Sequence, residues 1–360
     1  MPDALRSALV ALLLLGLLTG CASDPDAGTP YTPGAAWETV DNVEAEGWSP
    51  EGLRAARAHS DSIGSAAVMI VHEGRIVDEW GETQRKFKCH SIRKSFLSAL
   101  YGVAVQRGTV DPSATVGDLG IDDRNPLTEQ EKTATVRMLL KARSGIYHDA
   151  LYETPAMEAA RPERGSHAPG THWYYNNWDF NALGTIYEQE TGTEIHEAFA
   201  DRIAEPIGMQ SYEASDGSYV EGEDSVHPAY PFQMTARDMA RFGLLYLRGG
   251  AWNGTQVVPE FWVKESTVSY SDAGEDGGYG YLWWVSVDGQ HFEGVDGVPH
   301  GTYTARGAGG HTILIVPDLD LVLVHRTNTF EDRDIPYRQV GTLLLKVLDA
   351  KARWPSTPNF

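Results

Sequence analysis

With 360 residues, of which 42% are hydrophobic, the chain can bury a large core, either as one big domain or as two intimate ones. Its formal net charge of -21 disfavours binding to nucleic acid and electrostatic docking on anionic lipid, because lysine and arginine strengthen both interactions. No nucleic-acid partner is therefore expected.

The N-terminal segment is typical of an exported protein. Residues 1–20 hold an apolar run that is too short to span a bilayer comfortably. The Leu-Thr-Gly-Cys sequence that ends at Cys21 resembles a bacterial lipoprotein signal, which implies cleavage and lipidation of Cys21. An uncleaved anchor and plain secretion stay open as alternatives. We expect a cell-envelope protein, lipid-anchored on the periplasmic or extracellular side of a bacterial membrane, with Cys89 as a small buried hydrophobic residue.

The next segments predict a tether and the start of a folded domain. Residues 21–48 are rich in Pro, Gly, Asp and Ala without periodicity, which predicts a flexible tether. Ser49 and Pro50 predict the N-cap and first turn of a helix that continues to about residue 61. Residues 66–71 and 75–80 predict a β-hairpin.

The middle and end of the chain predict a helical block followed by strands. Start signals and apolar spacing indicate helices at residues 135–141, 193–204, 235–247 and 259–265, and a final helix around residues 340–348. Strands are expected at residues 279–287, and at 311–316 paired with 321–325.

This order of elements predicts an α+β fold in which one antiparallel sheet is built from both chain termini and flanked by helices. The expected domain covers residues 49–352, with a mostly helical lobe of about residues 95–275 inserted in the sheet lobe, and residues 353–360 form a C-terminal tail. A cleft between the lobes is the natural place for a site.

The strongest chemical signal lies between Cys89 and Arg107, where a hydroxyl and an amine stand three residues apart. Apolar residues at three- and four-residue steps predict a helix that ends near Gly108. Lys94 then lies one turn after Ser91 on the same face, within reach of the serine oxygen. The helix N-terminus favours the negative charge that develops when a serine attacks an acyl group. A single Ser-x-x-Lys match also arises by chance, so it needs corroboration.

A second candidate is the aromatic and polar cluster at residues 173–179. Tyr175 and Asn177 deliver a phenol and an amide from one segment. A phenol that shares a proton with a nearby lysine can pass it to a leaving group, and an amide can hold polar atoms of a substrate. An aromatic loop with a helix-capping asparagine is the alternative interpretation.

A third candidate is a glycine-rich strand expected at residues 305–310. Glycines before a strand allow a ligand to approach the backbone closely, as an oxyanion donor requires. A phosphate-binding loop is disfavoured, because neither a Gly-Lys-Ser/Thr ending nor a following helix is present. A plain glycine turn stays open as the alternative.

Together and in this order, the three signals resemble the serine β-lactamase and penicillin-binding-protein superfamily. The closer resemblance is to its branch of β-lactamase-related serine hydrolases, which includes esterases, D-amino-acid peptidases and oligoamide hydrolases. It runs from about residue 50 to 350, with further similar stretches at residues 139–145, 205–209, 235–247 and 279–284. It implies a β-lactamase/transpeptidase-like fold.

The resemblance also implies roles for the candidate residues. Ser91 matches the nucleophile, Lys94 its general base, and Tyr175 the residue that shares the proton of Lys94 and protonates the leaving group. Asn177 matches a substrate-binding amide. The implied reaction is a two-step acyl transfer through an acyl-Ser91 ester, with water as the final acceptor.

The glycine strand matches the family's oxyanion hole but departs from its pattern at one position. The backbone N–H groups of Ser91 and of Ala308, which follows Gly307, would hold the oxyanion. Where penicillin-recognising members carry Lys or His, this chain has Ala305, and its cation is Arg306. Neighbouring strand residues point to opposite faces, so Arg306 is expected to face away if position 305 faces the cleft. This disfavours β-lactams and D-Ala-D-Ala relative to esters or short amides.

The sequence thus predicts a serine hydrolase without metal or cofactor that cleaves ester or amide bonds of small substrates. His167 and His172 bracket a Pro-Gly pair that does not put two imidazoles on one helix face, so no metal site is expected. A β-lactamase or D-alanyl peptidase of the cell envelope is the enzymatic alternative, and a non-catalytic envelope-binding lipoprotein on the same fold is the second. The expected partners are a small ester, amide or peptide substrate and the membrane, through lipidated Cys21.

Overall fold

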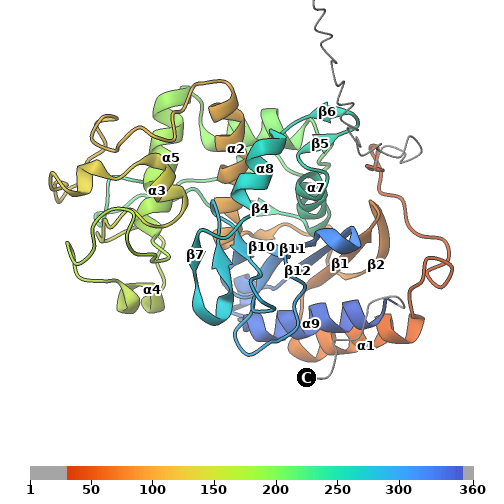
Figure 1. Ribbon diagram of the computed structural model, residues 1–360. Coiled ribbons are helices and arrows are strands. Elements are labelled where there is room, and N and C mark those ends of the chain that lie inside the picture. The colour runs from red at the N-terminus through yellow and green to blue at the C-terminus, as the bar shows by residue number, and fades with distance from the viewer. Residues whose placement is uncertain (1–30, 352–360) are drawn as a thin grey trace, which may run out of the picture. The chain divides into compact units, whose positions relative to one another are not determined.

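The structure is a computed structural model that describes residues 31–351 (Figure 1). The expected lipoprotein signal with Cys21, the beginning of the expected tether and the tail at 353–360 lie outside these residues. Within residues 31–351, no helix combines the length and the apolar character that crossing a membrane requires.

The fold is organised around an eight-stranded antiparallel sheet with the strand order β2-β1-β12-β11-β10-β9-β8-β7. Its strands are β1 (Ala67–His72), β2 (Arg75–Gly81), β7 (Ser271–Asp272), β8 (Gly278–Tyr279), β9 (Trp284–Val285), β10 (Tyr303–Gly307), β11 (His311–Val316) and β12 (Leu321–Arg326). Two short pairs lie outside it: β3 (Phe87–Lys88) with β4 (Gln233–Met234), and β5 (Ala251–Trp252) with β6 (Thr255–Gln256). The N-terminal hairpin pairs with the last strand, which confirms the predicted sheet built from both termini.

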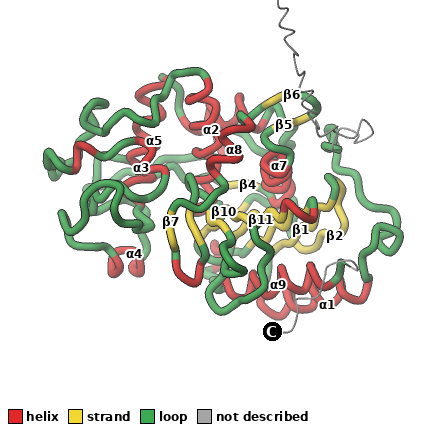
Figure 2. Tube along the Cα trace, viewed as in Figure 1, coloured by secondary structure: helices red, strands yellow, loops and turns green. Residues whose placement is uncertain are grey.

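Helices cover both faces of this sheet (Figures 1 and 2). Helices α1 (Pro50–Ile63) and α9 (Tyr337–Asp349) lie on one face, and α2 (Arg93–Gln106), α7 (Ala236–Leu247) and α8 (Glu260–Ser266) lie on the other. The remaining helices are α3 (Val136–Leu140), α4 (Pro155–Ala160), α5 (Asn177–Thr191) and α6 (Ile195–Phe199), and α3, α4 and α5 lie to the left of the sheet in Figure 1. Alternate residues of β1 face two cores: Met69 packs in the core that holds α2, α7 and α8, whereas Val68 packs in the core that holds α1 and α9.

Local start signals explain several of these helices. The side chain of Ser49 accepts a hydrogen bond of 3.1 Å from the Gly52 N–H and caps α1. Thr135 and Thr235 cap α3 and α7 in the same way. The helices predicted from these signals are therefore confirmed.

Two predicted strands are shorter than expected. The stretch at 279–287 is divided into β8 and β9, because Leu282 has a positive φ of 65°. The glycine-rich strand ends at Gly307, and residues 308–310 form the turn of a hairpin. At Gly309 and Gly310, φ values of 87° and 85° favour glycine. The plain-turn alternative is thus right for the last three residues.

The predicted tether is too long at its C-terminal end. Backbone hydrogen bonds join Val40 N–H to the Ile76 carbonyl and the Ile76 N–H to Glu38, both at 2.8 Å. Trp48 is 2% exposed and packs in the core of α1 and α9. The sequence did not predict this packing, because the segment has low hydrophobic periodicity. It contacts the domain through single side chains and irregular backbone rather than through a helix or strand.

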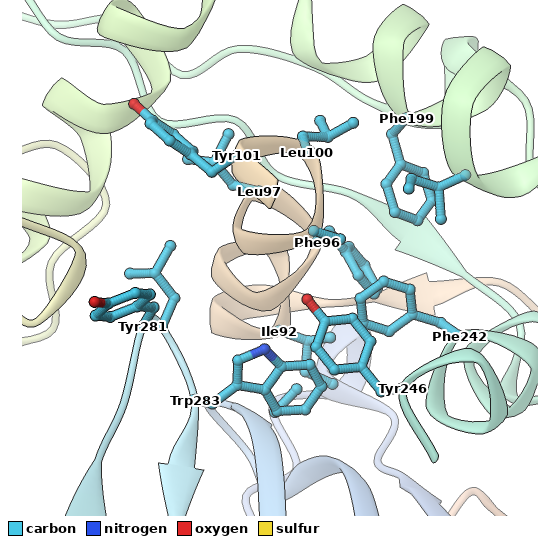
Figure 3. Close-up of a cluster of buried hydrophobic side chains, with 14 of the residues drawn as sticks. Ile92, Phe96, Leu97, Leu100, Tyr101, Phe199, Phe242, Tyr246, Tyr281 and Trp283 are labelled. Carbon is cyan, nitrogen blue, oxygen red and sulfur yellow. The ribbon is translucent and has the colours of Figure 1, made fainter. Parts of the chain in front are cut away.

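Helix α2 is the central helix of the larger core. Figure 3 shows Phe96 on α2 packing towards Phe199 and Phe242. The Phe96 side chain is fully buried. Local periodicity predicted this helix, and every residue from Arg93 to Ala104 is buried.

Replacing Phe96 by alanine is expected to lower the free energy of unfolding by about 3–5 kcal/mol, because a cavity remains where the ring was. Denaturant unfolding followed by circular dichroism measures the change. Phe261→Ala is the control, since that ring is 43% exposed and its loss is expected to cost less than about 1 kcal/mol. Equal effects of the two substitutions would contradict the assigned core.

Candidate active site

Ser91 lies in a 3-10 turn, His90–Ile92, that runs directly into α2. Lys94 is in the first turn of α2, and its Nζ lies 2.7 Å from Ser91 Oγ in a hydrogen bond. The three-residue spacing produces this contact, because successive helical turns bring positions three apart to one face. Ser91 is half-buried.

Lys94 is a buried amine without a carboxylate partner among the described residues. Its side chain is 1% exposed, and Nζ lies 4.6 Å from the ring centre of Tyr175 and 4.7 Å from that of Phe180. Burial, and then the positive charge of Arg93, hold the pKa of Lys94 well below its ordinary value of 10.5. A lysine in this environment can be neutral at moderate pH and accept a proton.

Tyr175 is the third group at the serine hydroxyl. Burial raises the pKa of Tyr175 to about 12, and a hydrogen bond with Ser91 acts in the other direction. Tyr175 is held by its neighbours: its ring centre lies 5.2 Å from that of Trp284 and 4.9 Å from that of Phe180. The structure therefore brings Ser91, Lys94 and Tyr175 together.

Asn177 is the first residue of α5 and lies next to the helix cap. The cap is Asn176, whose Oδ1 accepts a hydrogen bond of 3.1 Å from the Trp178 N–H. The Asn177 side chain is 1% exposed, and its Nδ2 donates to the Tyr152 carbonyl at 2.6 Å. Its Oδ1 has no hydrogen-bond partner within residues 31–351. The amide is thus fixed in orientation with one acceptor free.

The end of β10 lies against the segment that precedes Ser91. A Cβ placed on Gly307 would lie 2.4 Å from the Cys89 carbonyl oxygen, so only glycine permits this approach. Ala308 follows at an exposed position in the hairpin turn. The two backbone segments expected to supply oxyanion donors therefore meet.

The side chains of Ala305 and Arg306 point to opposite faces of the sheet. Ala305 is 1% exposed and packs in the core of α2. Arg306 is 4% exposed, and its Nη1 donates to Asp276 at 2.7 Å while its Nη2 donates to the His291 carbonyl. These hydrogen bonds occupy the Arg306 guanidinium.

Three neighbours of the site were not identified from the sequence. Tyr152 holds Asn177, Trp284 packs against Tyr175, and Arg93 is buried beside Lys94. Trp284 comes from an aromatic-rich stretch that could have suggested a site lining. Tyr152 carries no sequence signal, because its role depends on a backbone carbonyl in an irregular segment.

The described residues contain no group of three His, Cys, Asp or Glu side chains placed to hold a metal ion. The rings of His167 and His172 stack with their centres 3.9 Å apart. They lie in the irregular segment between α4 and α5.

Cys89 is fully buried, and burial raises the pKa of its thiol to about 12. The thiolate fraction near neutral pH is therefore negligible. We expect Cys89 to resist iodoacetamide in the folded protein and to react after denaturation, as measured by mass spectrometry. Rapid alkylation without unfolding would contradict this environment.

Solved structures with the same fold come from hydrolases and penicillin-binding-protein relatives. A Bacillus anthracis protein provisionally described as a 6-aminohexanoate-dimer hydrolase is 21% identical, covers 89% of each chain and has a TM-score of 0.64. A D-stereospecific amidohydrolase from Streptomyces is 18% identical, with 85% of this chain and 99% of that chain covered and a TM-score of 0.56. These similarities establish the β-lactamase-like fold.

Sequence comparison identifies the family. The sequence profile described as Beta-lactamase matches residues 41–343. A relative from Alkalihalophilus pseudofirmus is 23% identical over 297 residues, or 74% of this chain and 84% of that protein. A D-aminopeptidase from Brucella anthropi is 44% identical over 46 residues, which are 13% of this chain and 9% of that enzyme. The chain belongs to the Beta-lactamase family and is a hydrolase of the β-lactamase fold.

Proposed function

We propose that the chain is a serine hydrolase that cleaves an ester or amide bond of a small substrate through an acyl-Ser91 intermediate. The observation that carries the proposal is the 2.7 Å contact between Ser91 Oγ and the Nζ of a buried Lys94. A neutral amine at this distance removes the hydroxyl proton as the oxygen attacks the acyl carbon.

The proton and the leaving group follow a defined route. Lys94 takes the proton of Ser91, and Tyr175 passes its own proton to the departing oxygen or nitrogen as the acyl–leaving-group bond breaks. The protonated Lys94 then returns a proton to the Tyr175 oxygen, which restores both groups. Water then attacks the acyl carbon while Lys94 takes one of its protons, and that proton passes to Ser91 Oγ as the acyl–oxygen bond breaks and the acid leaves. The high pKa of Tyr175, about 12, keeps its phenol protonated at neutral pH, as a proton donor requires.

Two further groups would bind the reacting carbonyl and its neighbours. The N–H groups of Ser91 and Ala308 are the proposed oxyanion donors, which stabilise the charge that develops on the carbonyl oxygen. The free Oδ1 of Asn177 accepts a hydrogen bond from a substrate N–H.

Esters and short amides are the proposed substrates. With alanine at position 305 and Arg306 engaged by Asp276, no cation stands at that position to hold a substrate carboxylate. The provisional 6-aminohexanoate-dimer hydrolase and the amidohydrolase among the fold relatives favour amide substrates of this kind. A β-lactamase or D-alanyl peptidase is the alternative, and nitrocefin turnover comparable to nitrophenyl-ester turnover would favour it.

Trapping of the acyl-enzyme tests the reaction. The purified protein is incubated with a nitrophenyl ester, quenched in acid and digested, and mass spectrometry is expected to find the acyl group on the peptide that contains Ser91. Parallel screens with aminoacyl anilides and cephalosporins define the bond type. A protein that neither forms an acyl-peptide nor turns over any of these compounds would be the non-catalytic binding lipoprotein instead.

The envelope location is proposed on the N-terminal sequence alone. We expect a Cys21→Ser variant to lose incorporation of labelled palmitate and to leave the membrane fraction when expressed in bacteria. Ser49→Ala serves as a control for expression, because it changes only the cap of α1. Palmitate incorporation into the Cys21→Ser variant would contradict lipidation at this residue.

A further inference from the structure

A pocket of about 230 Å³ lies over the short strand pair of β3 and β4. Apolar and polar side chains share its lining, which consists of Lys88, Tyr152, Asp216, Ser218, Val220, Pro231, Phe232 and Gln233. This mixture is typical of a small-molecule site, and the volume suits a short chain rather than a drug-sized ligand.

Two walls of the pocket are attached to the proposed active site. The Tyr152 carbonyl accepts a hydrogen bond of 2.6 Å from Asn177 Nδ2. The Phe232 carbonyl accepts a hydrogen bond of 2.8 Å from the N–H of Cys89, whose Cα lies within about 8 Å of the Ser91 Cα because only two residue steps separate them. The pocket therefore borders the site.

The wall at Tyr152 is held in an uncommon backbone conformation. Tyr152 has a φ of 67° and His90, which precedes Ser91, has a φ of 48°. The rings of Tyr152 and His90 stack with their centres 6.4 Å apart. Non-glycine residues in this region of φ cost free energy and are retained most often around ligand sites.

One side of the pocket carries two hydrogen-bond donors. Lys88 stands opposite Gln233 in the antiparallel β3–β4 pair, so their side chains project from the same face. Both residues are exposed, whereas the neighbouring pair, Phe87 and Met234, is buried on the other face. An ammonium group and an amide N–H₂ group therefore project side by side at the pocket.

Lys88 has no acidic partner within residues 31–351. None of the ion pairs there includes it, and its Nζ lies 5.1 Å from the ring centre of Phe330. Asp216, the acid of the pocket, is paired with Lys86 at 2.7 Å and accepts a hydrogen bond of 2.8 Å from the Glu213 N–H. The pocket thus offers a positive charge to a ligand, on a chain whose formal net charge is -21.

The proton donor decides which part of a substrate lies in this pocket. Tyr175 protonates the leaving group in the proposed reaction, and its ring packs against those of Trp284 and Tyr279, with centres 5.2 and 5.9 Å away. The pocket instead adjoins Asn177 and the segment before Ser91. The leaving group then lies on the Tyr175 side, and the acyl chain lies on the Asn177 side.

We propose that this pocket binds the acyl part of the substrate, and that Lys88, together with Gln233, binds a carboxylate at the far end of the acyl chain. The substrate class is then esters or amides of dicarboxylic acids, in which one carboxyl group is acylated onto Ser91 while the other is bound. The inference rests on the proposed function, because the acyl carbon must reach Ser91 Oγ. Lys88 becomes a specificity-determining residue.

The test compares two nitrophenyl esters of equal chain length in the full chain. The acyl chain of nitrophenyl hydrogen adipate ends in a carboxylate, and that of nitrophenyl hexanoate ends in a methyl group. We expect the wild type to prefer the adipate ester, and the ratio of the two kcat/KM values to fall about tenfold in Lys88→Met. Lys88→Arg is expected to keep the preference, and high salt is expected to weaken it.

A matched control separates the pocket from the overall charge. Lys264→Met also removes one positive charge, from α8 outside the pocket, where Lys264 is paired with Glu260 at 2.7 Å. It is expected to keep the ratio within about twofold. A ratio that Lys88→Met leaves unchanged, or that both substitutions lower equally, would overturn the role of Lys88.

A second variant fills the pocket and leaves its charge in place. Ser218→Phe is expected to lower kcat/KM for the adipate ester about tenfold relative to nitrophenyl acetate, whose acyl group is too short to enter the pocket. Equal effects on the adipate and acetate esters would place the acyl chain elsewhere and overturn the inference.

Failure of the proposed function gives a different result. A wild type that hydrolyses none of these esters, or hydrolyses them without an acyl-Ser91 peptide in the mass spectrum, would overturn the proposed function and this inference with it. Hydrolysis through acyl-Ser91, with a ratio that does not respond to Lys88→Met, would overturn the role of the pocket alone.

Discussion

Replacing Ser91 by alanine is expected to reduce hydrolysis of every substrate by about 10⁴-fold or more and to abolish labelling by a serine-reactive phosphonate. The substitution removes the oxygen that lies 2.7 Å from Lys94 Nζ. Steady-state kinetics and mass spectrometry of the labelled peptide measure the two effects.

Ser98→Ala is the matched control, because it removes a hydroxyl from the same helix away from the site. Ser98 is buried and accepts a hydrogen bond of 3.4 Å from Trp262 Nε1, so we expect a loss of about 1 kcal/mol in stability and full activity. Phosphonate labelling that persists in Ser91→Ala and disappears in Ser98→Ala would reverse the assignment.

The fold was largely predictable because its elements carry local signals. A serine or threonine cap marks α1, α3 and α7, and the alternating contacts of β1 follow from its pairing with β2 and β12. The segment at residues 38–48 was predicted wrongly, since its docking depends on partners such as Ile76 and Lys351 that are distant in sequence. The division between β8 and β9 depends in the same way on the backbone turn at Leu282.

The sequence predicted the part of the site whose residues are close together in the chain. Ser91 and Lys94 are brought together by helical spacing alone, which a sequence displays directly. Tyr175 reaches Ser91 and Lys94 only through tertiary packing against Phe180 and Trp284. The family resemblance, and no local sequence pattern, predicted this contact.

The buried polar contacts of the site were beyond sequence reasoning. The Asn177 amide is held by the Tyr152 carbonyl, and Arg93 is held by Asn181 on a different helix. The first contact depends on how an irregular segment passes α5, and the second depends on how α2 packs against α5. Neither contact produces a periodic pattern in the sequence. The structure adds the charge environment of Lys94, which decides whether its amine can act as a base.

Replacing Lys94 by methionine is expected to lower kcat/KM by about 10³-fold or more, because Ser91 loses the group that takes its proton. The same substitution is expected to raise the free energy of unfolding at pH 7 by about 1 kcal/mol. The pKa of Lys94 is lower in the folded protein than its ordinary value of 10.5, so the unfolded chain binds more protons between these two values. The wild type therefore gains stability as pH rises through this window, and the difference from Lys94→Met narrows towards pH 10.5.

Urea unfolding at several pH values measures the stability of both proteins, and ester hydrolysis measures the activity. Lys141→Met is the matched control, since Lys141 Nζ also lies over an aromatic ring, 3.8 Å from the centre of Tyr270, and burial also lowers its pKa. Lys141 makes no contact with Ser91, so its replacement is expected to leave kcat/KM within about threefold. A Lys94→Met protein that is more stable but inactive would show that the buried amine lowers stability and is required for activity. An active Lys94→Met protein would remove Lys94 from the mechanism.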